Sequence, residues 1–251
     1  MGKVIAIANQ KGGTGKTSTV SALASGLTRA GKKVLMIDLD AQRSLSRSFN
    51  VESESNSIVS VISKAKGIEE VIQSIPQGDI ISGRSTIGAI DIILDEADKQ
   101  FALKDAIEPV IKKYDYILLD CPPALSTITI NAFVCADKVL IPAEAEKFSL
   151  DGVKDIVDTI YKIRDRYNSK LKIAGILITR YDGRTILGKE IKRIFEGMAQ
   201  ALGTKVYKPI RRSVVVGDAQ AYGTDIFTLS AKSKVAEDYK ALVEDVLREG
   251  E

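Results

Sequence analysis

The chain has 251 residues, of which 45% are hydrophobic and 27% are charged. This balance is typical of a folded globular protein and excludes a disordered chain, a collagen-like repeat and a coiled-coil rod. The net charge of +3 does not indicate a partner by itself. No apolar run approaches the roughly 18 residues that a membrane-spanning helix needs. We expect a single domain over residues 1–251.

Histidine is absent, and the two cysteines, Cys121 and Cys135, lack the C-x-x-C spacing. This composition excludes Ser–His and Cys–His triads, histidine-ligated metal sites, a disulfide framework and a four-ligand zinc site. We expect Cys121 to be a small packing residue. With no secretion leader in sight, we expect a cytoplasmic protein. Catalysis would have to use carboxylates, lysines, backbone amides and a bound cation.

Short β-branched runs alternate with helical stretches along the chain. A strand is predicted over Lys3–Ala8 and a helix over Gly15–Ala30, and further strands follow over Lys33–Asp38, Tyr116–Asp120, Lys138–Pro142 and Lys172–Thr179. The strand segments are apolar throughout, as expected for strands covered on both faces. The pattern predicts an α/β fold, a mostly parallel β-sheet with helices on both faces.

The middle of the chain is less informative. The serine-rich segment Ser44–Ser63 is either a mobile connection or a capped surface helix. The segment Glu52–Lys113 indicates little.

A glycine-rich turn separates the first predicted strand from the first helix. Such a turn directs backbone N–H groups and the positive end of the helix dipole at one point. Lys16 is placed to reach the β- and γ-phosphates of a nucleotide, and Thr17 to bind Mg²⁺. The alternative is a tight turn with an exposed lysine. The predicted nucleotide-binding residues here are Lys11, Gly12, Gly13, Thr14, Gly15, Lys16, Thr17 and Ser18.

Three aspartates follow predicted strands. Asp38 and Asp40 lie at the end of the second strand, and Asp120 ends a four-residue apolar run of the Walker-B pattern. Carboxyl ends of parallel strands form the edge where ligands bind. We therefore assign Asp38 and Asp120, with Thr17, to Mg²⁺, and Asp40 to the attacking water. The alternative for Asp40 is a helix N-cap.

The phosphate loop resembles that of the deviant Walker-A ATPases, whose motif is K-G-G-x-G-K-[ST] and whose fold is that of P-loop NTPases. Gln10 stands at the first glycine position of the ordinary motif, and Lys11 is an extra lysine. The resemblance implies that Lys11 reaches across a dimer interface to the partner's nucleotide. It also implies that Asp40 serves hydrolysis, so that Lys11, Lys16 and Asp40 are the catalytic residues.

Within this superfamily the chain resembles the ParA family of DNA-partitioning ATPases. The resemblance rests on the tetrapeptide D-C-P-P at Asp120 and on the segments Pro142–Glu146, Leu177–Thr185 and Ile210–Gly223. It implies that Arg180, Arg211 and Asp218 lie at the nucleotide. It further implies an ATP-dependent homodimer, slow hydrolysis of ATP with Mg²⁺, and a centromere-binding, ParB-like partner that stimulates hydrolysis. The chain departs from the family at Val215, where the family has a DNA-linked arginine, and at Gln220.

Three other functions stay open. A membrane-associated positioning ATPase of the MinD kind would need a basic C-terminal helix, whereas Val235–Glu251 is acidic. An orphan ATPase that positions protein cargo would share every motif. An ATP-using metabolic enzyme would need substrate residues that are not apparent. Because the first predicted strand begins at residue 3, we expect no N-terminal helix-turn-helix.

Basic residues concentrate in one segment. Residues 162–212 hold fourteen basic and four acidic side chains, a net charge of +10, so the rest of the chain carries −7. Such asymmetry indicates a polyanion-binding face, although a solvated helix surface is the alternative. We expect DNA binding without sequence preference, and hence association with the nucleoid, through Arg184, Lys189, Lys192, Arg193, Arg211 and Arg212.

Overall fold

A computed structural model describes residues 2–94, 99–146 and 149–250. Its sheet has the strand order β3-β4-β2-β5-β1-β6-β7. The β3–β4 pair is antiparallel, and every other pair is parallel. The strands are β1 (Lys3–Ile7), β2 (Val34–Asp38), β3 (Gln73–Ile75), β4 (Gly78–Ile81), β5 (Tyr116–Asp120), β6 (Lys138–Glu144) and β7 (Lys172–Thr179).

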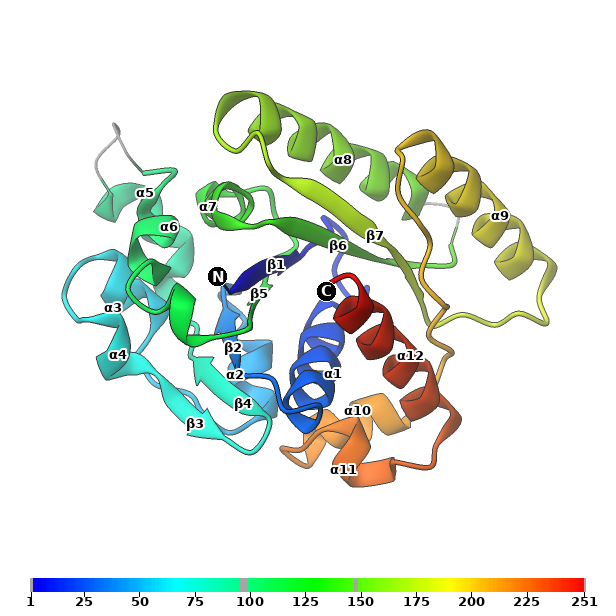
Figure 1. The fold of residues 1–251 in the computed structure, drawn as a ribbon, viewed down its shortest axis with the longest axis horizontal. Helices are drawn as coiled ribbons and strands as arrows, with labels where there is room; N and C mark the ends of the chain where they lie inside the picture. Colours follow the sequence, from blue (N-terminus) through cyan, green and yellow to red (C-terminus); the bar gives the residue numbers. More distant parts are fainter. Residues whose placement is uncertain (1, 95–98, 147–148, 251) are drawn as a thin grey trace.

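Helices connect the strands and cover both faces of the sheet (Figure 1). They are α1 (Lys16–Arg29), α2 (Ser44–Ser48), α3 (Ile58–Ile62), α4 (Ile68–Val71), α5 (Ile90–Ile93), α6 (Ala102–Ile107), α7 (Thr127–Cys135), α8 (Ser149–Arg166), α9 (Ile186–Ala201), α10 (Val215–Ala221), α11 (Ile226–Ser230) and α12 (Lys234–Arg248), with the 3₁₀ turns η1 (Ser85–Ala89) and η2 (Ile111–Lys113). The predicted α/β class, with a mostly parallel sheet between helical layers, is confirmed.

Neighbouring residues of each central strand point to opposite faces and enter two separate cores. In β5, Ile117 packs on the side of α6, α7 and α8, whereas Leu118 packs on the side of α1 and α12. Both side chains are fully buried. This explains why the strand segments are apolar throughout rather than alternating.

The bounds predicted for Tyr116–Asp120 and Lys172–Thr179 match the observed strands, and the other predicted boundaries differ by no more than two residues. The serine-rich segment forms two short helices, α2 and α3, rather than one helix or a wholly irregular connection. The hairpin of β3 and β4 lies in the segment from which the sequence predicted nothing.

The C-terminal helix α12 packs against α1. Its apolar face is buried there through Tyr239, Leu242, Val243 and Val246. Close approach of the two helices depends on Gly26, because a Cβ at that position would lie 2.4 Å from Val243 Cγ2. Among the described helices, none combines the length and apolarity needed to cross a bilayer.

We predict that Gly26→Ala destabilises the fold by about 1–3 kcal/mol, because the added methyl group overpacks the α1–α12 contact. Changing Val243 to Ala in the same chain should recover part of that loss. Urea unfolding measures both effects. Gly197→Ala is the matched control, since a Cβ there meets nothing within 4 Å in helix α9. It should stabilise the protein by up to about 1 kcal/mol. Equal destabilisation by both alanines would contradict the packing argument.

Candidate nucleotide site

The phosphate loop connects β1 to α1 at the edge formed by the carboxyl ends of the strands, which we call the carboxyl edge. Gly13 and Gly15 have φ of 79° and 83°, a region that favours glycine. No side chain caps the first turn of α1, and that turn contains no acidic residue. Its N–H groups and dipole therefore remain available to an anion. Asn9 Oδ1 and Thr179 Oγ1 hold the loop backbone at 3.0 and 2.9 Å.

Lys16 folds back into this loop. Its side chain is 7% exposed, and Nζ donates to the carbonyl of Lys11 at 3.1 Å. Burial lowers the pKa of Lys16, and the nearby carboxylate of Asp120 opposes that shift. An ammonium with so little water around it gains by facing phosphate oxygens.

Asp38 and Asp120 are partners in the register of β2 and β5 and are both buried. Thr17 Oγ1 donates to Asp120 Oδ2 at 2.7 Å, whereas the buried Asp120 Oδ1 has no hydrogen-bond partner. Burial, and secondarily the charge of Asp38, raise the pKa of Asp120 well above its ordinary value. An orphaned carboxylate oxygen beside a threonine hydroxyl fits Mg²⁺, whose protein ligands are a few oxygens.

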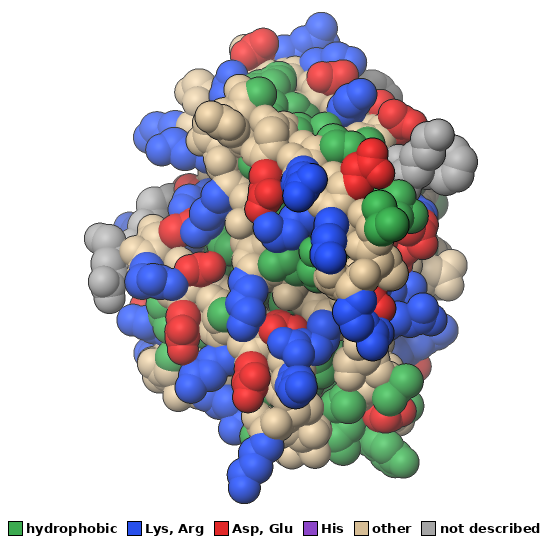
Figure 2. Space-filling view, turned by 90° about the vertical axis from the view of Figure 1, so that its right-hand side faces the viewer, with side chains coloured by type: hydrophobic (Ala, Val, Ile, Leu, Met, Phe, Trp, Pro, Cys, Tyr) green, Lys and Arg blue, Asp and Glu red, His purple; other side chains and the backbone are tan. Residues whose placement is uncertain are grey.

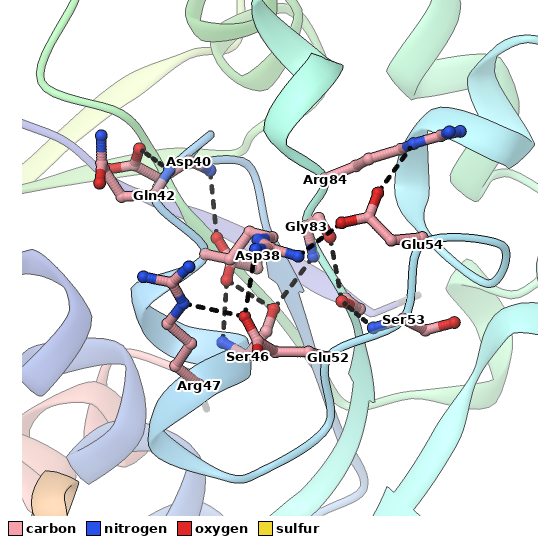
Figure 3. A network of polar contacts seen from close by, with 12 residues as sticks. Asp38, Asp40, Gln42, Ser46, Arg47, Glu52, Ser53, Glu54, Gly83 and Arg84 are labelled. Atoms are coloured by element: carbon pink, nitrogen blue, oxygen red, sulfur yellow. Dashed lines mark hydrogen bonds and ion pairs between the residues drawn. The ribbon is translucent and has the colours of Figure 1, made fainter.

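Asp38 is fixed by a serine on the following helix (Figure 3). Its Oδ2 accepts hydrogen bonds from the Ser46 amide at 2.8 Å and the Ser46 hydroxyl at 2.6 Å. Ser46 Oγ in turn accepts from the Gly83 amide at 3.0 Å. Burial raises the pKa of Asp38, and the Ser46 hydrogen bonds oppose the shift. This contact joins β2, α2 and the end of β4. It was not predicted, because nothing in the sequence pairs Ser46 with Asp38.

Asp40 is half-buried two residues beyond the end of the β2–β5 ladder at Asp38. Its Oδ1 accepts from the Gln42 amide at 2.9 Å, and its own amide donates to Asp38 Oδ1 at 3.1 Å (Figure 3). The first residue of α2 is Ser44, which follows Arg43, so Asp40 is not the N-cap of that helix.

Lys11 extends away from Lys16. Its Nζ lies 2.6 Å from Glu146 Oε2 and 3.8 Å from Glu144 Oε2, and 36% of its side chain is exposed. Glu144 also binds Arg180 at 2.8 Å. The two lysines of one loop therefore occupy different environments. The two glutamates come from the predicted segment Pro142–Glu146, although no role was assigned to them.

A hollow of about 370 Å³ adjoins the loop at Gly15 and Ser18. Arg180 and Arg211, which the family resemblance assigns to the nucleotide, line this hollow, and Arg211 is also bound to Asp238 at 2.6 Å. Asp218 is exposed on α10 and is not among the lining residues. Tyr239 and Gln220 also line the hollow, although neither was predicted to contact the nucleotide. The side-chain amide of Gln220 donates a hydrogen bond to Ser18 Oγ at 3.2 Å.

The predicted DNA-binding residues lie near the same edge. Arg184 is 91% exposed and binds Asp182 at 2.8 Å, and Arg212 is exposed. Lys189, Lys192 and Arg193 lie on the first half of α9. Figure 2 shows many lysine and arginine side chains over the side of the molecule on which α9 and α12 lie.

Comparison with known proteins places the chain in a family. A family model described as an AAA domain matches residues 2–173. The chain is 33% identical to the sporulation initiation inhibitor protein Soj of Bacillus subtilis strain 168 over 84% of each chain. It is 32% identical to the chromosome partitioning protein ParA of Caulobacter vibrioides, over 83% of this chain and 79% of that one. An uncharacterized protein of Mycobacterium tuberculosis strain H37Rv is 39% identical over 75% of the chain, which spans only 61% of that relative.

Solved structures share the fold of the chain. A cobyrinic acid a,c-diamide synthase from Mycobacterium smegmatis, with bound ADP and magnesium, is 29% identical and superposes with a TM-score of 0.85 over 99% of this chain and 95% of that one. A putative plasmid partition protein of Borrelia burgdorferi bound to AMPPNP, at 24% identity, shares the fold with a TM-score of 0.83 over 99% of this chain and 100% of that one. The chain belongs to the ParA/Soj family of deviant Walker-A ATPases.

Proposed function

We propose that this protein is a DNA-partitioning ATPase whose two subunits close face to face over two ATP molecules. The observation that carries the proposal is the separation of the two loop lysines. Lys16 is buried against its own loop, whereas Lys11 is partly exposed and held by glutamates outside the loop. One ammonium can therefore serve the nucleotide of its own subunit while the other reaches the nucleotide of the partner.

The residues around the loop divide the work of hydrolysis. Thr17, Asp38 and Asp120 would hold Mg²⁺, and the ion would neutralise the charge of the β- and γ-phosphates. Asp40 would orient the attacking water. Histidine is absent, so a carboxylate is the base available in this site. Slow turnover suits a timing function, because it keeps the ATP-bound state long-lived.

The dimer would bind DNA without sequence preference through the exposed basic residues near the carboxyl edge, and so reside on the nucleoid. A ParB-like, centromere-binding partner would stimulate hydrolysis and so release the DNA held near the carboxyl edge. The buried apolar face of α12 argues against the membrane-associated alternative, because that face is occupied by α1.

We predict different losses for the two lysines. Lys16→Ala removes the ammonium that faces the β- and γ-phosphates and should weaken ATP binding by about two orders of magnitude. Lys11→Ala should bind ATP normally but remain monomeric. Nucleotide-binding titration and light scattering with ATP and Mg²⁺ separate these outcomes. A normal ATP-dependent dimer of Lys11→Ala would show that this residue is only a surface lysine.

A third variant isolates the chemical step. Asp40→Ala should bind ATP and dimerise, while phosphate release falls by about 10²–10⁴-fold because the attacking water is no longer oriented. The dimer should consequently persist for longer than the wild type does. Unimpaired phosphate release would refute the role of Asp40, and loss of ATP binding would assign it to the metal instead.

A further inference from the structure

Lysines mark the start of five neighbouring strands. Lys3, Lys138 and Lys172 are the first residues of β1, β6 and β7. Lys32 and Lys33 precede β2, and Lys112 precedes β5 within η2. We call these six the amino-edge lysines, because they lie at the edge of the sheet opposite the carboxyl edge. At about 4.8 Å per strand, five strands make a row about 19 Å wide.

Three carboxylates lie among the six amino-edge lysines, and each already has a hydrogen-bond or ion-pair partner. Asp115 Oδ2 accepts from the Lys33 amide, and Asp137 Oδ2 accepts from the Val4 amide, each at 2.8 Å. Glu249 is shared by Lys138 and Lys205, each at 2.7 Å. Within the described ranges, the side chains of Lys32, Lys33, Lys112 and Lys172 form no ion pair. The edge therefore keeps an excess of positive charge.

The positive charge surrounds a hollow. A concavity of about 460 Å³ is lined by Lys3, Lys32 and Lys112, and Asp115 is the acidic residue in its wall. The three lysines come from three separate elements, and the ammonium of Lys3 also binds the Gly250 carbonyl just beyond α12. The two described ends of the chain accordingly lie close together in Figure 1. A hollow with three ammonium groups and one carboxylate suits phosphate groups.

We propose that the amino edge is a second DNA-contacting surface that binds the phosphate backbone whether or not ATP is bound. The inference rests on the proposed DNA binding and adds a surface to it. Phosphates of one DNA strand recur every 3.4 Å along the helix axis, so a row about 19 Å wide matches about five or six of them in length, and those on the near side of the duplex can contact the lysines. The lysines would contact phosphates and no base edges, which predicts binding without sequence preference.

The apolar surface argues for DNA rather than a lipid bilayer. An interfacial membrane site would present exposed apolar side chains beside the lysines. Among the described residues, the most exposed large apolar side chains are Ile92, Ile186, Val214 and Tyr222, and they lie on or beside α5, α9 and α10. Tyr167, 38% exposed at the end of α8, packs edge-on against Phe101.

The position of the amino edge explains why ATP would not control it. Residues Lys3–Ile7 of β1 separate it from the phosphate loop, which at about 3.3 Å per residue is a distance of about 16 Å. A dimer closed at the carboxyl edges would carry its two amino edges at its outer ends. It could therefore hold two further DNA segments in addition to the one at the predicted patch.

The test compares three variants in which a shorter, neutral amide replaces each cationic side chain. The amino-edge variant is Lys32→Gln, Lys33→Gln and Lys112→Gln, at exposed positions. The matched control is Lys64→Gln, Lys104→Gln and Lys154→Gln. It removes the same charge from exposed positions on the turn after α3, on α6 and on α8, respectively. The third variant, Arg184→Gln with Arg212→Gln, alters the patch near the carboxyl edge. Binding to a random-sequence duplex is measured at several salt concentrations, with ATP, with ADP and without nucleotide.

The wild type should bind DNA weakly without nucleotide and more tightly with ATP. The amino-edge variant should reduce the log–log salt slope by about 2.7, or 0.9 for each lost phosphate contact, in all three nucleotide states. The control should change the slope by less than about 1. The third variant should weaken DNA binding only when ATP is present.

Two results would overturn the inference. The first is a salt slope of the amino-edge variant equal to that of the control. The second is nucleotide-free wild type that does not bind DNA but binds vesicles containing phosphatidylserine. If ATP fails to strengthen DNA binding and the third variant has no effect on it, the proposed function is wrong, whereas the inference that the amino edge contacts DNA is not affected.

Discussion

The burial of two carboxylates at adjacent strand ends is the constraint on which the rest of the site depends. Asp38 and Asp120 are paired in register and withdrawn from water, and burial raises the pKa of both. Lys16 and Thr17 partly compensate Asp120, yet one of its oxygens stays without a hydrogen bond. Such a pair is unfavourable until a cation arrives. Its location beside a glycine-rich loop makes Mg²⁺ bound to a nucleotide the cation that this geometry favours.

The same edge connects the site to the remainder of the molecule. Ser46 ties Asp38 to α2 and to Gly83 at the end of β4 (Figure 3). Glu144, the last residue of β6, contacts both Lys11 and Arg180. These contacts connect the phosphate loop and Asp38 to the loop after β2 and to the residues before α9, which include Arg184, one of the predicted DNA-binding residues.

Sequence reasoning succeeded where one physical signal dominated. Five strands were predicted because each is a continuous apolar run, and the turn between β1 and α1 because it is rich in glycine. The β3–β4 hairpin escaped because QSI and GDII are too short to show a period. Contacts such as Lys11 with Glu146 could not be predicted, because packing brings together residues 135 positions apart. The basic segment of residues 162–212 looked like one face, yet Lys172 lies at the amino edge and Arg184 near the carboxyl edge.

Thermal unfolding with Mg²⁺ alone, with ATP alone and with both tests the central claim most directly. If Asp120 and Asp38 bind a cation that is itself bound to the nucleotide, the rise in Tm with both ligands should exceed the sum of the rises with each ligand separately. Asp120→Asn, which removes the buried charge, should abolish that excess. Two results would contradict the account. One is a wild-type rise in Tm with both ligands that equals the sum of the separate rises, and the other is an Asp120→Asn variant that keeps the same excess over that sum.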